Sequence, residues 1–133
     1  MKTLLMVLPI SAAIILCSFM IQPKPWDVPA EFKNMKNPVV KTDKVMAEGK
    51  LKYNQVCSGC HGLTGKGDGE KLKNLTNIKP LSLTTDDFVK ERDGEHFFKI
   101  KYGRDKNHSF SGKLDDESIW CVVHYMKTFI PKQ

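Results

Sequence analysis

The sequence contains no run of five like charges and no basic stripe interleaved with aromatic residues. Its 21 Lys and Arg residues against 15 Asp and Glu leave only a mild positive balance, so nucleic acid is a poor match as a partner. Cysteine is also scarce: there are four, and Cys17 lies in an apolar leader, which leaves three for the folded part. An odd number of cysteines argues against a disulfide framework. It favours a specific chemical role for the closely spaced pair Cys57 and Cys60.

The sequence also lacks the marks of β structure, because no stretch alternates between apolar and polar residues and no hairpin signal is present. Apolar residues recur at helical spacing instead, and no segment repeats along the chain. We therefore predict one small all-α domain, as a length of 133 residues suggests. Helices are expected from Thr42 or Asp43 to Val56, near 70–75, from Thr85 or Asp86 with a break near 93–96, and from Asp115 toward 130.

The first residues have the pattern of a targeting segment. No charged residue occurs between Leu4 and Ile21, and at helical rise this stretch spans about 27 Å, close to a bilayer core. Because no small-residue cleavage site is well placed, we favour an uncleaved membrane anchor over residues 1–22. Lipid attachment at Cys17 and ordinary cleavage remain open. All three alternatives place the domain outside the cytoplasm, and the favoured anchor predicts a domain attached to the inner membrane and facing the periplasm.

Residues 23–41 carry four prolines and no regular period. They are expected to form a tether that lies over the surface or spaces the domain, residues 42–133, from the membrane. Trp26 and Phe32 in this segment suit either a membrane interface or packing back on the domain.

One stretch decides the chemistry: "VCSGCHGLTGKGDG", residues 56–69, has two cysteines separated by two residues and a histidine directly behind the second. A zinc site normally needs a second pair of Cys or His ligands, which the sequence lacks. A thioredoxin-type pair follows a strand and opens a helix, whereas this pair closes a predicted helix. Covalent haem attachment needs two thiols for two vinyl groups and an adjacent histidine for the iron. Cys57, Cys60 and His61 supply all three, so we predict one haem c.

Around this motif, over about residues 42–130, the sequence resembles the class I c-type cytochromes. The resemblance rests on "CSGCHG", "GKGDG", a segment around Pro80, "KIKYGR" and the closing "SIWCVVHYMKTF", in that order. It implies a small cytochrome c fold whose first and last helices cross beside one covalently bound haem. Gly49 and Tyr53 are then expected to meet Val122 and Tyr125. A close crossing would explain a helical glycine, which costs about 1 kcal/mol relative to Ala.

The resemblance also implies an axial ligand set for the iron. His61 is the proximal ligand, and the Pro80 carbonyl is the best match for the group that holds its other ring nitrogen. In similar cytochromes the loop before the last helix reads "GR…MPxF" and its Met is the second ligand. Here that loop is "GRDKNHSF", and alignment puts His108 where the Met would be. We therefore expect His108 as the distal ligand and a potential lower than that of Met/His ligation.

The sequence leaves alternatives to His108 as the distal ligand. They are His96, His124, Met126 and an open or water-filled site. The other methionines lie in the leader, in the tether or, like Met46, on a helix face that suits core packing.

Other residues have weaker predicted roles. Tyr102, Arg104 and Trp120 are candidates for contacts with the haem edge or propionates, with ordinary packing or solvation as the alternative. Cys121 has the character of a buried apolar residue. Lysines flank the attachment motif and form either a solvated surface or a ring that steers an acidic redox partner; they are Lys50, Lys52, Lys66, Lys71, Lys73 and Lys79.

Together these observations predict a membrane-tethered monohaem cytochrome that carries single electrons and is not an enzyme. Its expected partners are redox proteins such as an oxidase, a reductase or a dehydrogenase. The main alternative is a haem-based sensor or ligand-binding domain with a labile distal site. A small peroxide- or nitrogen-oxide-handling enzyme is a further alternative, for which only Arg104 and His96 offer polar distal groups.

Overall fold

The computed structural model describes residues 26–74, 82–104 and 109–130, and within these ranges every regular element is a helix. The order of the elements is α2 (Ala30–Lys33), α3 (Asp43–Val56), α4 (Ser58–His61), the 3₁₀ helix η2 (Glu70–Asn74), α5 (Asp86–Lys90), α6 (Asp93–Tyr102), α7 (Asp116–Met126) and the 3₁₀ helix η3 (Lys127–Phe129). The predicted all-α class is confirmed. No helix in the described part of the chain is both long and apolar enough to cross a bilayer.

The main helices begin where local capping chemistry predicts. The side chains of Thr42, Thr85 and Asp115 each accept a hydrogen bond from the backbone N–H three residues further on. Each of these side chains satisfies a donor that the first helical turn leaves unpaired. The predicted break near 93–96 lies slightly earlier, at the extended residues Glu91 and Arg92 between α5 and α6.

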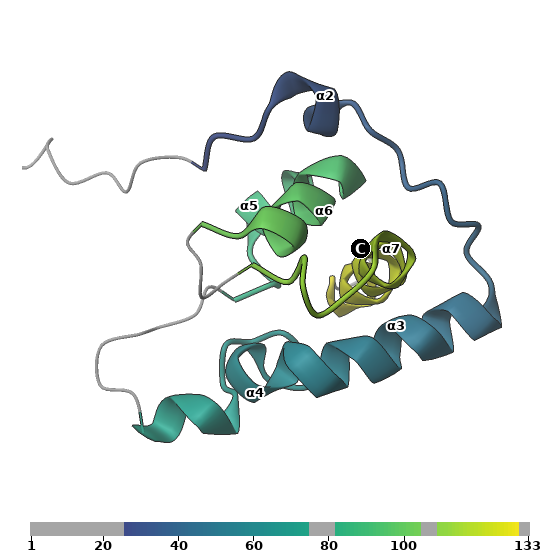
Figure 1. Cartoon of the computed structure of the whole chain (residues 1–133). Coiled ribbons are helices and arrows are strands. Elements are labelled where there is room, and N and C mark those ends of the chain that lie inside the picture. The colour runs from purple at the N-terminus through teal and green to yellow at the C-terminus, as the bar shows by residue number, and fades with distance from the viewer. Residues whose placement is uncertain (1–25, 75–81, 105–108, 131–133) are drawn as a thin grey trace, which may run out of the picture.

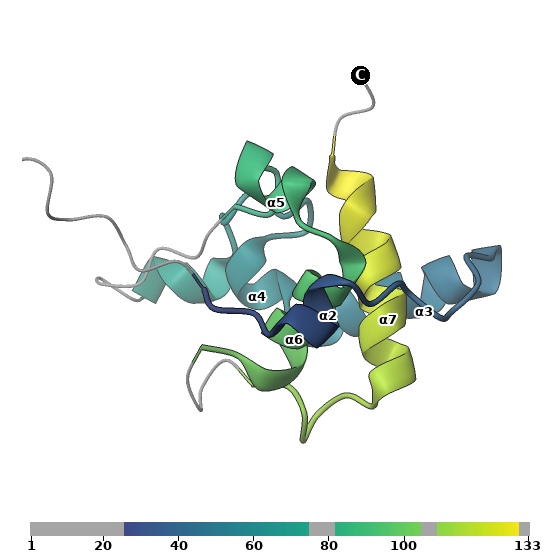
Figure 2. The ribbon, with the colours of Figure 1, turned by 90° about the horizontal axis from the view of Figure 1, so that it is seen from above.

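The two longest helices, α3 and α7, cross as predicted, and Figure 2 shows α7 running across α3. The crossing is close because Gly49 lies directly against the backbone of Cys121: a Cβ built on Gly49 would be 2.2 Å from the Cys121 carbonyl oxygen. The ring of Tyr53 is fully buried, with its centroid 5.5 Å from that of Tyr125. Cys121 itself is 3 % exposed, as expected of a residue on the packed face of α7.

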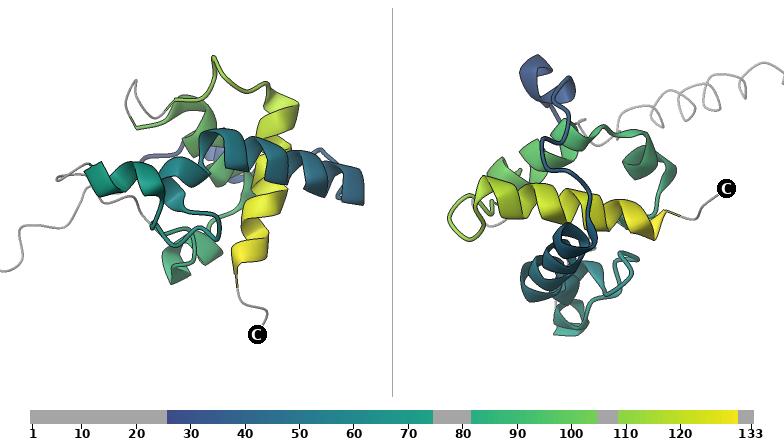
Figure 3. Two further views of the ribbon diagram at one scale, coloured as in Figure 1. Left: turned by 90° about the horizontal axis from the view of Figure 1, so that it is seen from below. Right: turned by 90° about the vertical axis from the view of Figure 1, so that its right-hand side faces the viewer.

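The core lies between this crossing and the shorter helices. Its buried members are mostly aromatic or aliphatic, and the ring of Trp120 stacks on that of Phe97 with centroids 4.1 Å apart. In Figure 1, α5 and α6 lie on one side of the molecule and α4 lies on the other. The same arrangement appears when the molecule is turned to its right-hand side (Figure 3).

Residues 26–41, which we call the N-terminal strap, lie over the domain. The strap contains α2 and runs along α6 (Figures 1 and 2). Val28 is 2 % exposed, and the ring of Phe32 packs on those of Phe97, Phe98 and Tyr102. Of the two alternatives for Trp26 and Phe32, packing back on the domain is therefore the one seen for Phe32.

Candidate functional site

The three residues of the attachment motif share one helical turn. Cys57 ends α3 and also precedes α4, and its carbonyl accepts the N–H groups of Cys60 (3.1 Å) and His61 (2.9 Å). Residues three and four apart on a helix lie on the same face. The two sulfurs and the imidazole therefore leave the backbone from neighbouring positions, where one planar group can meet all three.

The two cysteines of the motif are free thiols. Cys57 is 8 % exposed, Cys60 is half-buried, and neither forms a disulfide. Burial, together with the neighbouring Cys60, raises the pKa of the Cys57 thiol to about 12. Cys57 thus remains a neutral thiol at neutral pH. A neutral thiol suits an apolar environment such as the edge of a buried haem.

The loop after the motif fixes the backbone of α4. Gly67 N–H donates to the His61 carbonyl at 2.8 Å, and Gly69 N–H donates to the Cys60 carbonyl at 3.2 Å. Gly62 and Gly67 have φ values of +78° and +76°, which glycine adopts without strain. The glycine-rich stretch therefore serves to fold the chain tightly back onto the motif.

Tyr53 holds the same loop from the core. Its hydroxyl is buried and donates a 2.7 Å hydrogen bond to the Gly62 carbonyl. Burial raises the pKa of Tyr53 well above its usual value, so the hydroxyl remains a donor at any physiological pH. The sequence indicated Tyr53 as a packing residue only; this hydrogen bond, which spans nine residues, left no sequence signal.

Three other predicted site residues have contacts of their own. Trp120 is 5 % exposed, and its ring lies on Phe97. Tyr102 is 45 % exposed and contacts the rings of Phe32 and Phe98. The guanidinium of Arg104 lies 5.0 Å from the centre of the Trp26 ring.

Pro80 and His108 lie outside the described residues. Gly103, with φ +65°, ends α6, and directly after residue 108 the chain returns to the same helix. Ser109 Oγ donates to the Lys101 carbonyl at 2.8 Å, and Phe110 N–H donates to the Ile100 carbonyl at 3.1 Å. The described residues on either side of 105–108 therefore both lie at the last turn of α6.

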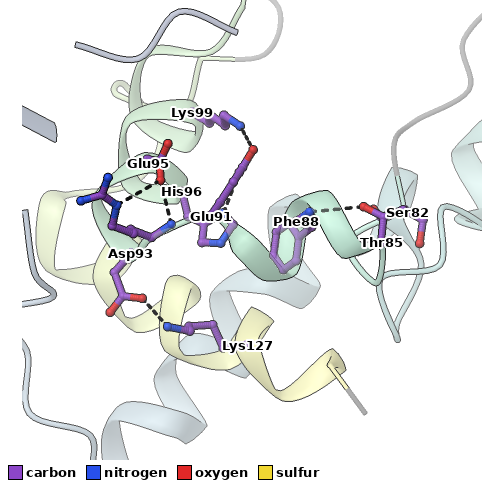
Figure 4. Close-up of polar contacts among 10 residues, drawn as sticks. Ser82, Thr85, Phe88, Glu91, Asp93, Glu95, His96, Lys99 and Lys127 are labelled. Carbon is purple, nitrogen blue, oxygen red and sulfur yellow. Dashed lines mark hydrogen bonds and ion pairs between the residues drawn. The ribbon is translucent and has the colours of Figure 1, made fainter. Parts of the chain in front are cut away.

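The histidines on α6 and α7 have other contacts. The ring of His96 is 3 % exposed, lies 4.3 Å from that of Phe88 and has its Nδ1 3.4 Å from Glu91 Oε2 (Figure 4). His124 Nε2 lies 2.7 Å from the Val39 carbonyl oxygen. Met126 is 5 % exposed within the core cluster.

The surroundings of His96 predict a pH-dependent stability. Burial lowers the pKa of His96 from 6.5 to about 4; Lys99 and Lys127 act in the same direction, and Asp93 and Glu95 oppose them weakly. The imidazole is then neutral in the folded state but takes up a proton near pH 6.5 when unfolded. Stability should be complete above pH 6.5 and fall as the pH drops toward 4, by at most about 3 kcal/mol, because the Glu91 carboxylate 3.4 Å from Nδ1 favours the protonated ring.

Urea denaturation of the holoprotein from pH 4 to pH 7.5 measures this loss. His96→Gln should flatten the profile, whereas His124→Gln, which changes a half-buried histidine, should leave it steep. An equally steep profile in His96→Gln would assign the dependence to other groups.

The motif fits haem c by its donor chemistry, because a thiol pair and an imidazole on one helical turn are the groups that such a haem requires. Comparison with solved structures gives a similar fold: a chain of the Kuenenia stuttgartiensis reducing HAO-like protein complex, with a TM-score of 0.59 and 24 % identity. The match covers 91 % of this chain and 59 % of that chain, so this chain spans about three fifths of that chain's length. No curated protein matches in sequence.

A family model gives the decisive match. The model described as cytochrome c oxidase, cbb3-type, subunit III, matches residues 44–126, which run from the first turn of α3 to the end of α7. It includes the attachment motif and the crossing of the two longest helices. The chain therefore belongs to this family of c-type cytochrome domains, which carry covalently bound haem c and transfer electrons.

Proposed function

We propose that this domain is a monohaem electron carrier at the outer face of the plasma membrane, with its iron held by His61 and His108. The observation that carries the proposal is the shared helical turn of Cys57, Cys60 and His61. When bound, haem c supplies an iron that gains and loses one electron. The chain's part is to hold that group in one position, so that little rearrangement accompanies each transfer.

Hydrogen bonds hold the backbone of the attachment motif, as this role requires. Two backbone hydrogen bonds from the glycine loop and one from the Tyr53 hydroxyl fix the main chain around α4. Cys57 and Cys60 would each form a thioether, and His61 would direct one ring nitrogen at the iron. The Pro80 carbonyl is proposed to hold the other ring nitrogen and so to set the orientation of the imidazole.

Three observations support His108 as the second ligand. The last turn of α6 holds the chain on both sides of residues 105–108. Helix α6 lies across the molecule from α4, the helix that carries His61 (Figures 1 and 3). His96 and His124 already contact Glu91 and the Val39 carbonyl, and Met126 packs in the core.

The partners are proposed to be redox proteins with acidic surfaces, such as an oxidase, a reductase or a dehydrogenase. Lysines near the attachment motif are exposed on α3, the glycine loop and η2; they include Lys50, Lys66 and Lys71. Lys52 and Lys73 pair with Glu48 and Glu70, which reduces their net contribution. The remaining positive charge would speed the encounter with an acidic partner at low ionic strength.

Haem retention after denaturation tests the attachment. Cys57→Ala or Cys60→Ala should leave a single thioether, and the double variant should lose all haem from the unfolded chain, because no covalent bond remains. Cys121→Ala is the matched control, since Cys121 is also a buried free thiol but lies on α7. Haem staining of a denaturing gel, with the pyridine haemochrome spectrum, reports the number of thioether bonds. Haem kept by the double variant, or lost by Cys121→Ala alone, would contradict the assignment.

A further inference from the structure

The N-terminal strap is fixed to the domain along its length. The Phe32 carbonyl oxygen lies so close to Gly94 that a Cβ built there would be 2.0 Å away. Asn34 Oδ1 accepts from the Arg92 guanidinium at 2.9 Å, and Asn37 Nδ2 donates to the Trp120 carbonyl at 3.0 Å. A flexible spacer makes no such contacts, so the strap belongs to the rigid body of the domain.

The strap begins only a few residues after the apolar leader. Four residues, 22–25, separate Ile21 from Trp26. Five residue steps of fully extended chain reach at most about 17 Å. If residues 4–21 lie in a bilayer, Trp26 must therefore lie within this distance of the bilayer's outer boundary.

The surface at Trp26 is aromatic. Trp26 is half-buried beside Lys99 and Arg104, whose charged groups lie 5.5 and 5.0 Å from its ring centre. The rings of Phe98 and Tyr102, 5.0 Å apart, lie on the same helix, α6, as Lys99. We call Trp26, Phe98 and Tyr102 the aromatic face. Tyr and Trp are the residues enriched at the level of lipid headgroups, where one end of the ring is apolar and the other is wet.

The charges around the aromatic face are nearly balanced. Lys99 pairs with Glu91, Lys101 pairs with Asp116, and Asp27 is exposed next to Trp26. Such a surface gains little from negatively charged lipids, because the two α6 lysines beside it already have acidic partners. Any affinity for a bilayer must come from the rings, and it should therefore be insensitive to salt.

We propose that the aromatic face rests on the headgroup layer of the bilayer and fixes the orientation of the haem domain on the membrane. This inference rests on the proposed membrane anchor. It changes the expected behaviour of the domain: the short link and the fixed strap do not allow it to swing far from the surface. Its redox partner must then offer its own electron-transfer site close to the membrane plane.

Photo-crosslinking of the full-length holoprotein in phosphatidylcholine nanodiscs tests the inference. Tyr102→p-benzoylphenylalanine should yield lipid adducts, detected by mass, several-fold more than Leu51→p-benzoylphenylalanine. The two positions are matched in exposure, 45 % and 50 %, but Leu51 lies on α3, on the other side of the molecule from α2 and α6 (Figure 1). The excess at position 102 should persist when salt rises from about 0.1 M to about 1 M, where the Debye length is near 3 Å.

Loss of the anchor and loss of the orientation would give different results. Release of the chain from membranes by alkaline carbonate would overturn the anchor, and with it this inference. A chain that stays in the membrane but gives equal adducts at both positions, or adducts only at position 51, would overturn the orientation alone. An excess at position 102 that disappears at high salt would contradict ring-driven contact.

Discussion

His108→Ala should convert a low-spin haem that does not bind CO into a high-spin or water-ligated haem that binds it stoichiometrically. The proposed ligand set contains two imidazoles, and the variant removes one of them. Within the described residues, the groups best able to replace it are engaged elsewhere: His96 lies against Glu91, and His124 lies against the Val39 carbonyl. Absorption spectra of both oxidation states, with and without CO, measure the change.

The fold should survive this substitution, because residues 109–111 remain hydrogen-bonded to the last turn of α6. His108→Met should restore low-spin haem, raise the potential and bring in the weak near-infrared absorption of sulfur ligation, since thioether ligation raises the potential relative to imidazole. His96→Ala and His124→Ala serve as controls and should keep the parent spectrum.

The same experiment separates the carrier from its alternative. An unchanged low-spin spectrum in His108→Ala would make another side chain the ligand, with Met126 the next to test. A parent protein that already binds CO would favour the sensor or ligand-binding domain, because its distal site would then be open or labile.

The helices were predictable because their signals are local. Thr42, Thr85 and Asp115 each accept from an N–H three residues away, so the cap and its partner stand in the same short stretch of sequence. The attachment motif is local for the same reason, since one turn of helix brings Cys57, Cys60 and His61 to one face. The crossing of α3 and α7 was predicted from the resemblance to class I c-type cytochromes, and the costly glycine inside a helix indicated that another helix passes close to it.

For the N-terminal strap, the sequence left two alternatives open: a segment that lies over the domain or a spacer between the domain and the membrane. Its prolines remove any period, and its attachments are single contacts over long separations, such as Asn37 with the Trp120 carbonyl, 83 residues apart. The buried Glu91–His96 contact was missed because nothing in "ERDGEH" distinguishes a solvated acid from one that faces a buried imidazole. Side chains that bond to distant backbone carbonyls, like those of Tyr53 and Ser109, likewise leave no pattern in the sequence.

Gly49→Ala should destabilise the holoprotein, although the same change in an open helix would stabilise it. Alanine is favoured over glycine inside a helix by about 1 kcal/mol. At Gly49, however, the new Cβ would lie 2.2 Å from the Cys121 carbonyl oxygen, 2.7 Å from its carbon and 3.0 Å from Tyr125 Cβ. Two of these three atoms are backbone and cannot turn away, so α3 and α7 must move apart.

Overpacking of this kind typically costs about 1–3 kcal/mol, which exceeds the propensity gain and sets the sign. The separation would also disturb Tyr53, one turn further along α3, whose hydroxyl holds the loop behind the attachment motif. Urea denaturation followed at the haem absorption band measures the loss. Gly112→Ala is the matched control, because a Cβ there meets nothing within 4 Å and its backbone needs no positive φ. A Gly49→Ala protein as stable as Gly112→Ala would mean that the two helices do not pack at this distance.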